Sequence, residues 1–303
     1  MGFPTETVYG LGGNALDPGA AKAIYAAKGR PSDNPLIVHI SAFEQIEGLA
    51  SEIPEVAKQL SDAFWPGPLT MVLPKRSCVP DETTGGLATV AIRFPMGVAA
   101  DIITYAGCPI AAPSANISGR PSPTSWQHVQ KDLGGKIEAI VMGIPCEGGI
   151  ESTVLDLTGD VLTILRPGLI TPEMISAVTG REVIYDPAIL GRPDPGLIPK
   201  APGMKYKHYA PKAEMVLFSG EKTKVEEILE ERRKALETAG KKVGVLEYAD
   251  GREAAEKLFY DLRAMDAEGV DVILAAALPQ EDSLGFSVMN RMLKSAGYNI
   301  EEV

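Results

Sequence analysis

The chain has 303 residues, of which 45% are hydrophobic and 23% charged, so two domains of ordinary globular composition are expected. No apolar run reaches the ~18 residues of a membrane helix, and no signal peptide precedes the first loop, so we predict a cytoplasmic protein. The net charge of −11 is concentrated in residues 213–303, which hold 12 basic and 19 acidic side chains, and this balance disfavours a nucleic-acid partner because it repels phosphate.

The opening segment combines glycines with hydroxyl side chains. Thr5, Thr7 and Tyr9 alternate just before the glycines at positions 10, 12 and 13. This pattern predicts a strand end that leads into a tight loop whose backbone can approach a ligand closely. It is neither a Walker loop nor a GxGxxG fingerprint. A helix is predicted at about 18–27, with Lys28 near its C-terminal end.

The segment from Lys28 to His39 has the composition of an anion-binding loop. Two cations stand two residues apart, two prolines restrain the backbone, and Asn34 supplies an amide before a short apolar strand at 36–40. Lys supplies charge, and Arg30 adds a planar fork that fits phosphate or carboxylate. A solvated basic turn is the alternative interpretation of this segment.

Helices and strands then alternate up to residue 179. From Thr89 to Phe94, alternate residues fall on opposite faces, which predicts a strand. Arg93 lies on one of these faces, and an arginine in such a position is more often exposed on the surface than buried. Because several strands are close enough for hairpins, we expect an α/β fold with a mixed sheet. The predicted strands are 69–73, 89–94, 109–112, 137–142 and segments within 150–156 and 162–168, and the predicted helices are 42–63 broken at Pro54, 97–106, one capped by Thr124 or Ser125, and 171–179.

The remaining chain divides into a linker and a second domain. Residues 185–212 are rich in proline and glycine but end in a cluster of aromatic and basic side chains. Residues 213–303 predict three strand–helix units of a small parallel sheet, with strands at 215–218, 242–246 and 270–276. We therefore predict domains at 1–184 and 213–303 joined by the linker 185–212. The first strand–helix turn of residues 213–303 lacks the glycine-rich fingerprint of dinucleotide-binding folds, so we assign it no dinucleotide.

Five segments, in the right order over nearly the whole chain, resemble the YrdC/Sua family of threonylcarbamoyl-adenylate synthases in its long form. These segments are 4–11, 28–39, 113–116, 151–153 and 202–211. The resemblance implies a YrdC-like twisted mixed sheet with flanking helices, plus a small Rossmann-like C-terminal domain. It also implies that L-threonine, bicarbonate and ATP give threonylcarbamoyl-AMP and pyrophosphate, and that the product passes to the tRNA threonylcarbamoyl transferase machinery that modifies adenosine 37 of tRNA.

The resemblance also implies roles for individual residues. Lys28 and Arg30 are the catalytic cations that neutralise the triphosphate. The other ATP-binding residues are Asn34, Thr89, Ser114, Asn116, Ser122, Arg166, Tyr206 and His208. The threonine-binding residues are Thr7, His39, Arg93, Ala112 and Ser152, with Arg93 facing the carboxylate and the Ala112 carbonyl facing the amine. In the long form the linker folds over the site, which would place Tyr206 and His208 over the nucleotide.

The residues present suit this chemistry. Attack of a carbamate on the α-phosphate needs positioning and charge neutralisation rather than a dedicated nucleophile. The three histidines and the widely spaced Cys78, Cys108 and Cys146 have no ligand spacing, so we predict no metal site built by the protein, no disulfide framework, and buried cysteines. Mg²⁺ is expected to arrive with ATP.

Three alternatives remain at this point. An RNA-binding module is disfavoured because the chain has no aromatic and basic stripe. A carbamoyltransferase subunit of hydrogenase maturation would carry zinc-finger cysteines and an acylphosphatase segment. A catalytically silent nucleotide-binding paralogue is disfavoured by the joint presence of Lys28, Arg30, Ser114 and Asn116.

One departure from the family pattern concerns the start of the chain. Family members carry about one helix and one strand before the loop that contains Thr7, whereas this sequence begins at Met1, within that strand. A strand without a neighbour leaves an open edge, so we expect a destabilised sheet near Thr7.

Overall fold

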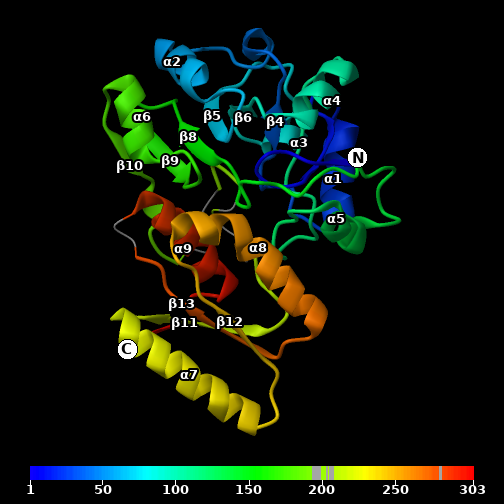
Figure 1. The fold of residues 1–303 in the computed structure, drawn as a ribbon. Helices are drawn as coiled ribbons and strands as arrows, with labels where there is room; N and C mark the ends of the chain where they lie inside the picture. Colours follow the sequence, from blue (N-terminus) through cyan, green and yellow to red (C-terminus); the bar gives the residue numbers. More distant parts are fainter. Residues whose placement is uncertain (193–198, 203, 205–207, 280–281) are drawn as a thin grey trace. The chain divides into compact units, whose positions relative to one another are not determined.

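The structure is a computed structural model that describes residues 1–192, 199–202, 204, 208–279 and 282–303 (Figure 1). The chain forms two compact units. The first comprises residues 1–118 and 122–206, and the second comprises 119–121 and 207–303. In the described part of the chain, no helix is long and apolar enough to cross a membrane.

The first unit contains an eight-stranded mixed sheet with the order β10-β9-β8-β5-β6-β4-β7-β3. Strand β4 pairs parallel with β6, and β5 pairs antiparallel with β6, which confirms the predicted mixed sheet. A separate antiparallel pair is formed by β1 and β2. The strands are β1 Gly2–Phe3, β2 Gly10–Leu11, β3 Gly13–Asn14, β4 Ile37–His39, β5 Leu69–Pro74, β6 Thr89–Arg93, β7 Ile110–Ala111, β8 Thr153–Asp156, β9 Leu162–Arg166 and β10 Val183–Tyr185.

Local sequence signals fix the helices of this unit. Helix α1 begins where the Asp17 side chain accepts a hydrogen bond from the Gly19 N–H, and it ends at Gly29, whose φ of 61° is left-handed. This ending turns the chain, directly after Lys28, into the segment that precedes β4, residues 28–36, which we call the cationic loop. The helices are α1 Pro18–Lys28, η1 Phe43–Gly48, α2 Glu55–Phe64, α3 Asp81–Thr84, α4 Val98–Ala106, α5 Trp126–Leu133, α6 Pro172–Thr179 and η2 Pro187–Ile189.

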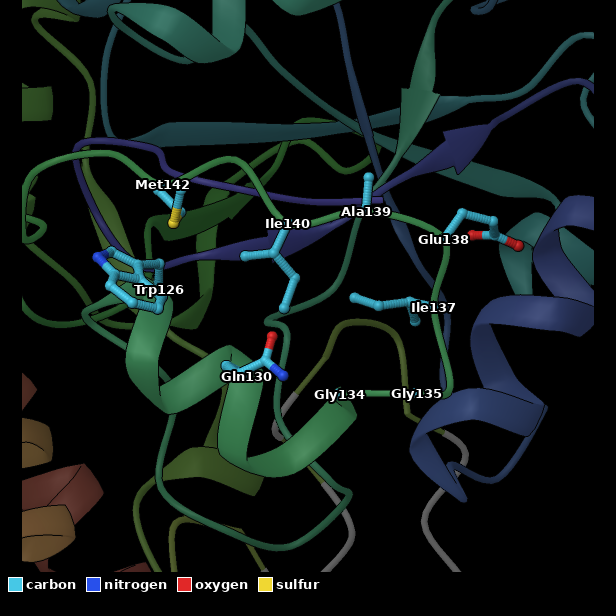
Figure 2. Close-up of a pocket in the computed structure, with 9 residues that line it drawn as sticks. All are labelled: Trp126, Gln130, Gly134, Gly135, Ile137, Glu138, Ala139, Ile140 and Met142. Atoms are coloured by element: carbon cyan, nitrogen blue, oxygen red, sulfur yellow. The ribbon is translucent and has the colours of Figure 1, made fainter.

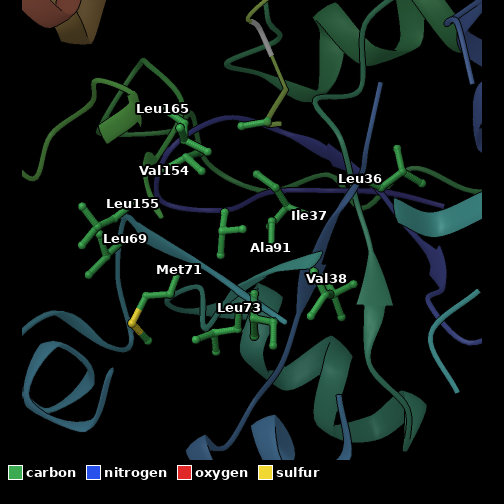
Figure 3. Close-up of a cluster of buried hydrophobic side chains, with 14 of the residues drawn as sticks. Leu36, Ile37, Val38, Leu69, Met71, Leu73, Ala91, Val154, Leu155 and Leu165 are labelled. Carbon is green, nitrogen blue, oxygen red and sulfur yellow. The ribbon is translucent and has the colours of Figure 1, made fainter. Parts of the chain in front are cut away.

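Apolar side chains of adjacent strands form the core that holds this sheet. Figure 3 shows the cluster, in which Leu69, Met71 and Val154 are fully buried. A one-residue slip of any of these strands would turn buried side chains to the other face, so burial fixes the register. The register in turn fixes which polar side chains end at the same edge of the sheet.

The second unit is a four-stranded parallel sheet of order β12-β13-β11-β14, which confirms the small Rossmann-like domain. The sequence did not predict β14, because Ile300 is the one apolar residue in this three-residue strand. The elements are β11 Glu214–Ser219, α7 Lys222–Thr238, β12 Val243–Leu246, α8 Gly251–Glu268, β13 Val272–Ala276, α9 Ser283–Ser295 and β14 Ile300–Glu302.

The segment near the N-terminus differs from prediction in two ways. The predicted strand 137–142 contains an isolated bridge between Ile140 and Gly2, because its partner β1 is two residues long. The Gly2 N–H donates to the Ala139 carbonyl, and the Gly2 carbonyl accepts from the Val141 N–H, each at 2.8 Å. Strand β1 is therefore paired on both sides, and the expected open edge was wrong.

Two smaller predictions also fail. Cys78 is exposed rather than buried, and its Sγ donates to the Gly48 carbonyl at 3.1 Å; Cys108 is half-buried, and Cys146 is buried as expected. Ser125 stands at the N-cap of α5 but its side chain makes no capping bond. The neighbouring Thr124 N–H instead donates to Nδ1 of His128 at 3.3 Å.

Candidate active site

The loop between β1 and β2 is held by hydrogen bonds of the Thr5 side chain, and the Thr7 side chain in this loop is buried. The Thr5 hydroxyl donates to the Val8 carbonyl at 2.7 Å and accepts from the Thr7 N–H at 3.2 Å. Such side-chain bonds to nearby backbone fix turns of this kind. Thr7 is fully buried, and its Oγ1 accepts a hydrogen bond from Nη1 of Arg93 at 2.9 Å.

Arg93, at the end of β6, is buried and oriented by three protein partners. Its side chain is 4% exposed, so the surface interpretation was wrong. Nε donates to the Gly67 carbonyl at 3.1 Å, Nη1 donates to Thr7, and Nη2 lies 2.7 Å from Oε1 of Glu6. The other Glu6 oxygen accepts from the Met96 N–H at 3.2 Å. Sequence reasoning missed Glu6, because an acidic residue is not expected in an anion site.

The register of the sheet brings four further polar side chains to the same edge. His39 on β4 and Thr70 on β5 are the residues paired with Arg93 on either side. The Thr70 and Ser152 hydroxyls lie 2.8 Å apart. Arg166 donates from Nη2 to the Ser152 hydroxyl at 3.1 Å and from Nε to the Ser152 carbonyl at 3.0 Å. Most of the predicted threonine set thus converges, together with Arg166 from the predicted nucleotide set.

His39 is neutral in this environment. Burial, and next the Arg93 charge, lower the pKa of His39 to about 3. Its Nδ1 lies 3.1 Å from the Ile37 carbonyl, which accepts a hydrogen bond from this nitrogen when Nδ1 carries the proton. His39 therefore contributes shape and hydrogen bonding to the site at neutral pH, and no positive charge.

Lys28 joins the end of α1 to the loop after β7. Its side chain is 2% exposed, and Nζ donates to the carbonyls of Ser114 and Asn116, each at 2.5 Å. The Ser114 hydroxyl donates to Oδ1 of Asn116 at 2.6 Å. The Ala112 N–H donates to the Ile37 carbonyl at 2.9 Å, which sets this loop beside β4. Lys28, Ser114 and Asn116 therefore form one hydrogen-bonded cluster, and their contact with ATP stays a prediction.

The cationic loop holds an unsatisfied acceptor. Arg30 donates to the Asn34 carbonyl from Nε and Nη2 at 3.3 Å and to the Pro35 carbonyl at 3.0 Å, which fixes the loop. Asn34 is 2% exposed, and among the described residues its Oδ1 has no hydrogen-bond partner. A buried acceptor without a donor costs about 1–3 kcal/mol. A donor on a bound ligand, such as an amino or hydroxyl group, would satisfy it.

Thr89 lies at the opposite end of β6 from Arg93. In the register of β5 and β6, Thr89 is paired with Pro74 and Arg93 is paired with Thr70. Thr89 is four residues from Arg93, or about 13 Å along an extended strand. The candidate site therefore has two ends, one with the cationic loop that precedes β4 and one with Arg93 and His39 at the ends of β6 and β4.

The segment 151–153 contributes a second carboxylate that sequence reasoning left without a role. The Ser122 hydroxyl donates to Oε1 of Glu151 at 2.5 Å, and both side chains are buried. Gly168 packs directly on this segment, since a Cβ atom there would lie 2.5 Å from the Thr153 nitrogen and 2.8 Å from the Glu151 carbonyl oxygen. The turn after β9 therefore shapes the backbone that positions Ser152.

Two predicted residues are not placed at this site. Tyr206 lies outside the described residues. His208 belongs to the second unit, where its ring centroid lies 5.4 Å from that of Tyr209. The placement of the linker over the nucleotide stays a prediction.

Neither a metal-binding cluster nor the hollow in Figure 2 adds to this site. Among the described residues, no group of three or more His, Cys, Asp or Glu side chains could hold a metal ion. A hollow of about 200 Å³ lies between α5 and residues 134–142, and Trp126 and Met142 are among the residues that border it (Figure 2). None of the predicted site residues that the structure describes lines this hollow.

Comparisons with known proteins agree along the whole chain. Residues 1–168 match the Sua5/YciO/YrdC family, described as Telomere recombination, and residues 170–297 match the Threonylcarbamoyl-AMP synthase, C-terminal domain. The threonylcarbamoyl-AMP synthase of Pyrococcus abyssi is 52% identical, over 100% of this chain and 92% of the relative. That of Bacillus subtilis is 46% identical, over 98% and 89%.

Solved structures extend this likeness to the fold. The crystal structure of P. abyssi Sua5 complexed with L-threonine has a TM-score of 0.94 and 51% identity, and the match covers 100% of this chain and 92% of that one. A doubly substituted form of the same protein gives the same TM-score at 50% identity, and the match covers 100% of this chain and 90% of that one. By sequence and by structure, this chain belongs to the Sua5/YciO/YrdC family and carries the threonylcarbamoyl-AMP synthase C-terminal domain.

Proposed function

We propose that this protein is an L-threonylcarbamoyladenylate synthase, a nucleotidyltransferase that forms threonylcarbamoyl-AMP and pyrophosphate from L-threonine, bicarbonate and ATP. The observation that carries the proposal is the likeness, over the full chain, to the threonine-bound P. abyssi protein. The polar residues gathered at one edge of the sheet support it. Four of the proposed site residues are cations, whereas the acidic residues of the same segments are Glu6, Asp33 and Glu151, so the site keeps the positive balance that anionic substrates require.

Threonine is proposed to bind at the end formed by Thr7, His39, Arg93, Ala112 and Ser152. Its carboxylate meets Arg93, and its amine meets the Ala112 carbonyl. Because Glu6 already neutralises Arg93, the substrate gains from an oriented guanidinium rather than from an uncompensated charge. The neutral His39 adds no second charge, which keeps the pocket suited to a zwitterion.

ATP is proposed to bind at the other end of the site. Lys28 and Arg30 face the triphosphate, and the unsatisfied Asn34 Oδ1 accepts a hydrogen bond from the nucleotide. The other nucleotide contacts are Thr89, Ser114, Asn116, Ser122, Arg166, Tyr206 and His208. Mg²⁺ is proposed to arrive on ATP, because this ion keeps several waters and binds substrate phosphates without an all-protein cage.

The proposed reaction has two steps. Bicarbonate loses hydroxide to give CO₂, and the threonine amine attacks the carbon of CO₂ to give a carbamate; the proton that the amine loses and the hydroxide leave together as water. A carbamate oxygen then attacks the α-phosphorus in line, and the bond to the pyrophosphate oxygen breaks with its electron pair. Positioned cations stabilise the charge that develops on the departing pyrophosphate, so the chain needs no nucleophilic side chain.

Pyrophosphate release tests this proposal. Purified protein with ATP, Mg²⁺ and bicarbonate should release pyrophosphate with L-threonine, and much less with L-serine or without an amino acid. Mass spectrometry should detect threonylcarbamoyl-AMP in the same reaction. Absence of threonine-dependent release from protein with a folded circular dichroism spectrum would refute the synthase assignment.

The product is further proposed to pass, in the cytoplasm, to the transferase machinery that modifies adenosine 37 of tRNA. The acidic balance of the chain suits handover of a small molecule better than strong direct tRNA binding. Addition of a purified threonylcarbamoyl transferase complex and tRNA transcript should yield the modified nucleoside. Pyrophosphate release without tRNA modification would reject this step and leave the synthase reaction standing.

A further inference from the structure

Strand β12 presents an open backbone edge. Among the described residues, β13 is the strand that pairs with it. Alternate residues of a parallel strand bond to the same neighbour. The Lys242 carbonyl accepts from the Val272 N–H, so Gly244 and Leu246 continue the ladder to β13. The N–H and C=O groups of Val243 and Val245 therefore face outward, where a further strand can pair with them.

A hollow of about 350 Å³ lies beside this edge, between β12 and α8. Gly244 has no side chain, and a Cβ atom there would lie 2.7 Å from the Met265 sulfur, so α8 packs closely on the strand. Val243 to Leu246 contain neither a charged residue nor proline, the usual guards of an edge strand. The edge therefore offers both backbone pairing and room for side chains.

The hollow is acidic. Glu247, Asp261 and Glu268 line it, and no Lys, Arg or His is among its lining residues. The Tyr248 hydroxyl donates to Oδ2 of Asp261 at 2.9 Å, which orients that carboxylate. Lys242, outside the lining, donates to the Glu268 carbonyl at 2.8 Å and pairs with the Glu268 carboxylate at 3.7 Å, so Glu247 and Asp261 give the hollow its negative sign. A basic side chain entering the hollow would meet carboxylates.

The net negative charge of the second unit adds to the negative electrostatic potential of the hollow. Residues 213–303 hold 12 basic and 19 acidic side chains. Three of the basic side chains, Arg263, Arg291 and Lys294, are at most 7% exposed. The excess of acidic over basic side chains is therefore larger on the surface of this unit than in its sequence. Such a surface attracts basic segments at long range and repels acidic ones.

We propose that β12 is a docking site for a basic, extended segment of a partner protein, which adds to the sheet as a further strand. Backbone hydrogen bonds to Val243 and Val245 provide affinity, and basic side chains at alternate positions enter the acidic hollow. The opposite edge of the sheet suits this partner less well, because Glu301 on β14 already pairs with Arg232 at 2.9 Å.

The probe is a fluorescein-labelled peptide of alternating lysine and valine, seven residues long, with an alternating glutamate and valine peptide as control. Anisotropy with the full chain should detect the basic peptide and not the acidic one, with a strong decrease at high salt. Hydrogen exchange should show slower exchange of the Val245 amide when the basic peptide is present. Equal binding of both peptides, or no binding at ~1 mM, would overturn the proposal.

Two variants separate backbone pairing from charge. Val245→Pro removes the outward N–H but spares the ladder to β13, and Glu247→Lys reverses one charge of the hollow. Each should weaken binding by about tenfold, the effect of one lost hydrogen bond or ion contact. Glu231→Lys makes the same charge change on the exposed surface of α7 and should bind nearly as the wild type does. If Val245→Pro fails to fold, Glu247→Lys decides; equal loss in Glu231→Lys would refute a local site.

Discussion

The ion pair between Glu6 and Arg93 gives the sharpest test of how the threonine end is built. Glu6→Gln keeps the shape of the side chain and removes its charge, which leaves the guanidinium, 4% exposed, without its counterion. Removing one partner of a buried pair costs about 3–5 kcal/mol, and the 15% exposure of the Glu6 side chain favours the lower value. For a unit of this size, about 3 kcal/mol corresponds to a melting temperature lowered by roughly 6–12 °C.

Differential scanning fluorimetry measures this shift, and Glu82→Gln is the matched control. Glu82 pairs with Lys22 at 3.1 Å on the surface, where water screens the charges, so its substitution should change the melting temperature little. L-Threonine should stabilise Glu6→Gln more than the wild type, because the substrate carboxylate then supplies the missing counterion. Equal small shifts in both variants would show that Glu6 does not compensate Arg93.

Two further predictions concern the proposed reaction, and one concerns the pH dependence of stability. Lys28→Met should lower the rate of pyrophosphate release by about 10²–10³-fold, because it removes a positioned charge; a loss explained by unfolding in circular dichroism would contradict this role. The folded-state pKa of His39 lies at about 3, below the unfolded value, so the stability that His39 contributes is lost as pH falls below ~6.5, by about 1.4 kcal/mol per unit. His39→Asn should flatten that acid dependence in urea titrations, and an unchanged slope would reject the low pKa. Thr70→Val should raise KM for threonine more than KM for ATP, because it frees the Ser152 hydroxyl; equal changes in both would assign Thr70 to packing alone.

The sequence predicted most elements because their local signals are strong. The caps of α1, the turn at Gly29 and the apolar runs of the strands act within a few residues, and the helix ends where Lys28 enters the loop, as expected. The segments that carry Lys28, Ser114 and Asn116 were singled out separately, and their meeting follows from two hydrogen bonds of one ammonium group.

The features that sequence missed depend on tertiary contacts. Arg93 alternates with apolar residues as a surface arginine would, and its burial follows from Glu6, Thr7 and Gly67, which lie far from it in the chain. Thr70 has no local signal and gains a role by standing next to Arg93 in the sheet. The predicted strand at 137–142 has strand-forming residues, and pairing stops because its neighbour is short.

Gly168 has a consequence for how natural variants of this protein should be interpreted. It touches the backbone of residues 151–153, where any side chain would displace Thr153. A change to alanine would therefore displace the backbone that positions Ser152, while every residue assigned to substrate remained intact in the sequence. An inventory of catalytic side chains would classify such a variant as competent, so screening for loss of activity in this family has to include the positions that act as spacers.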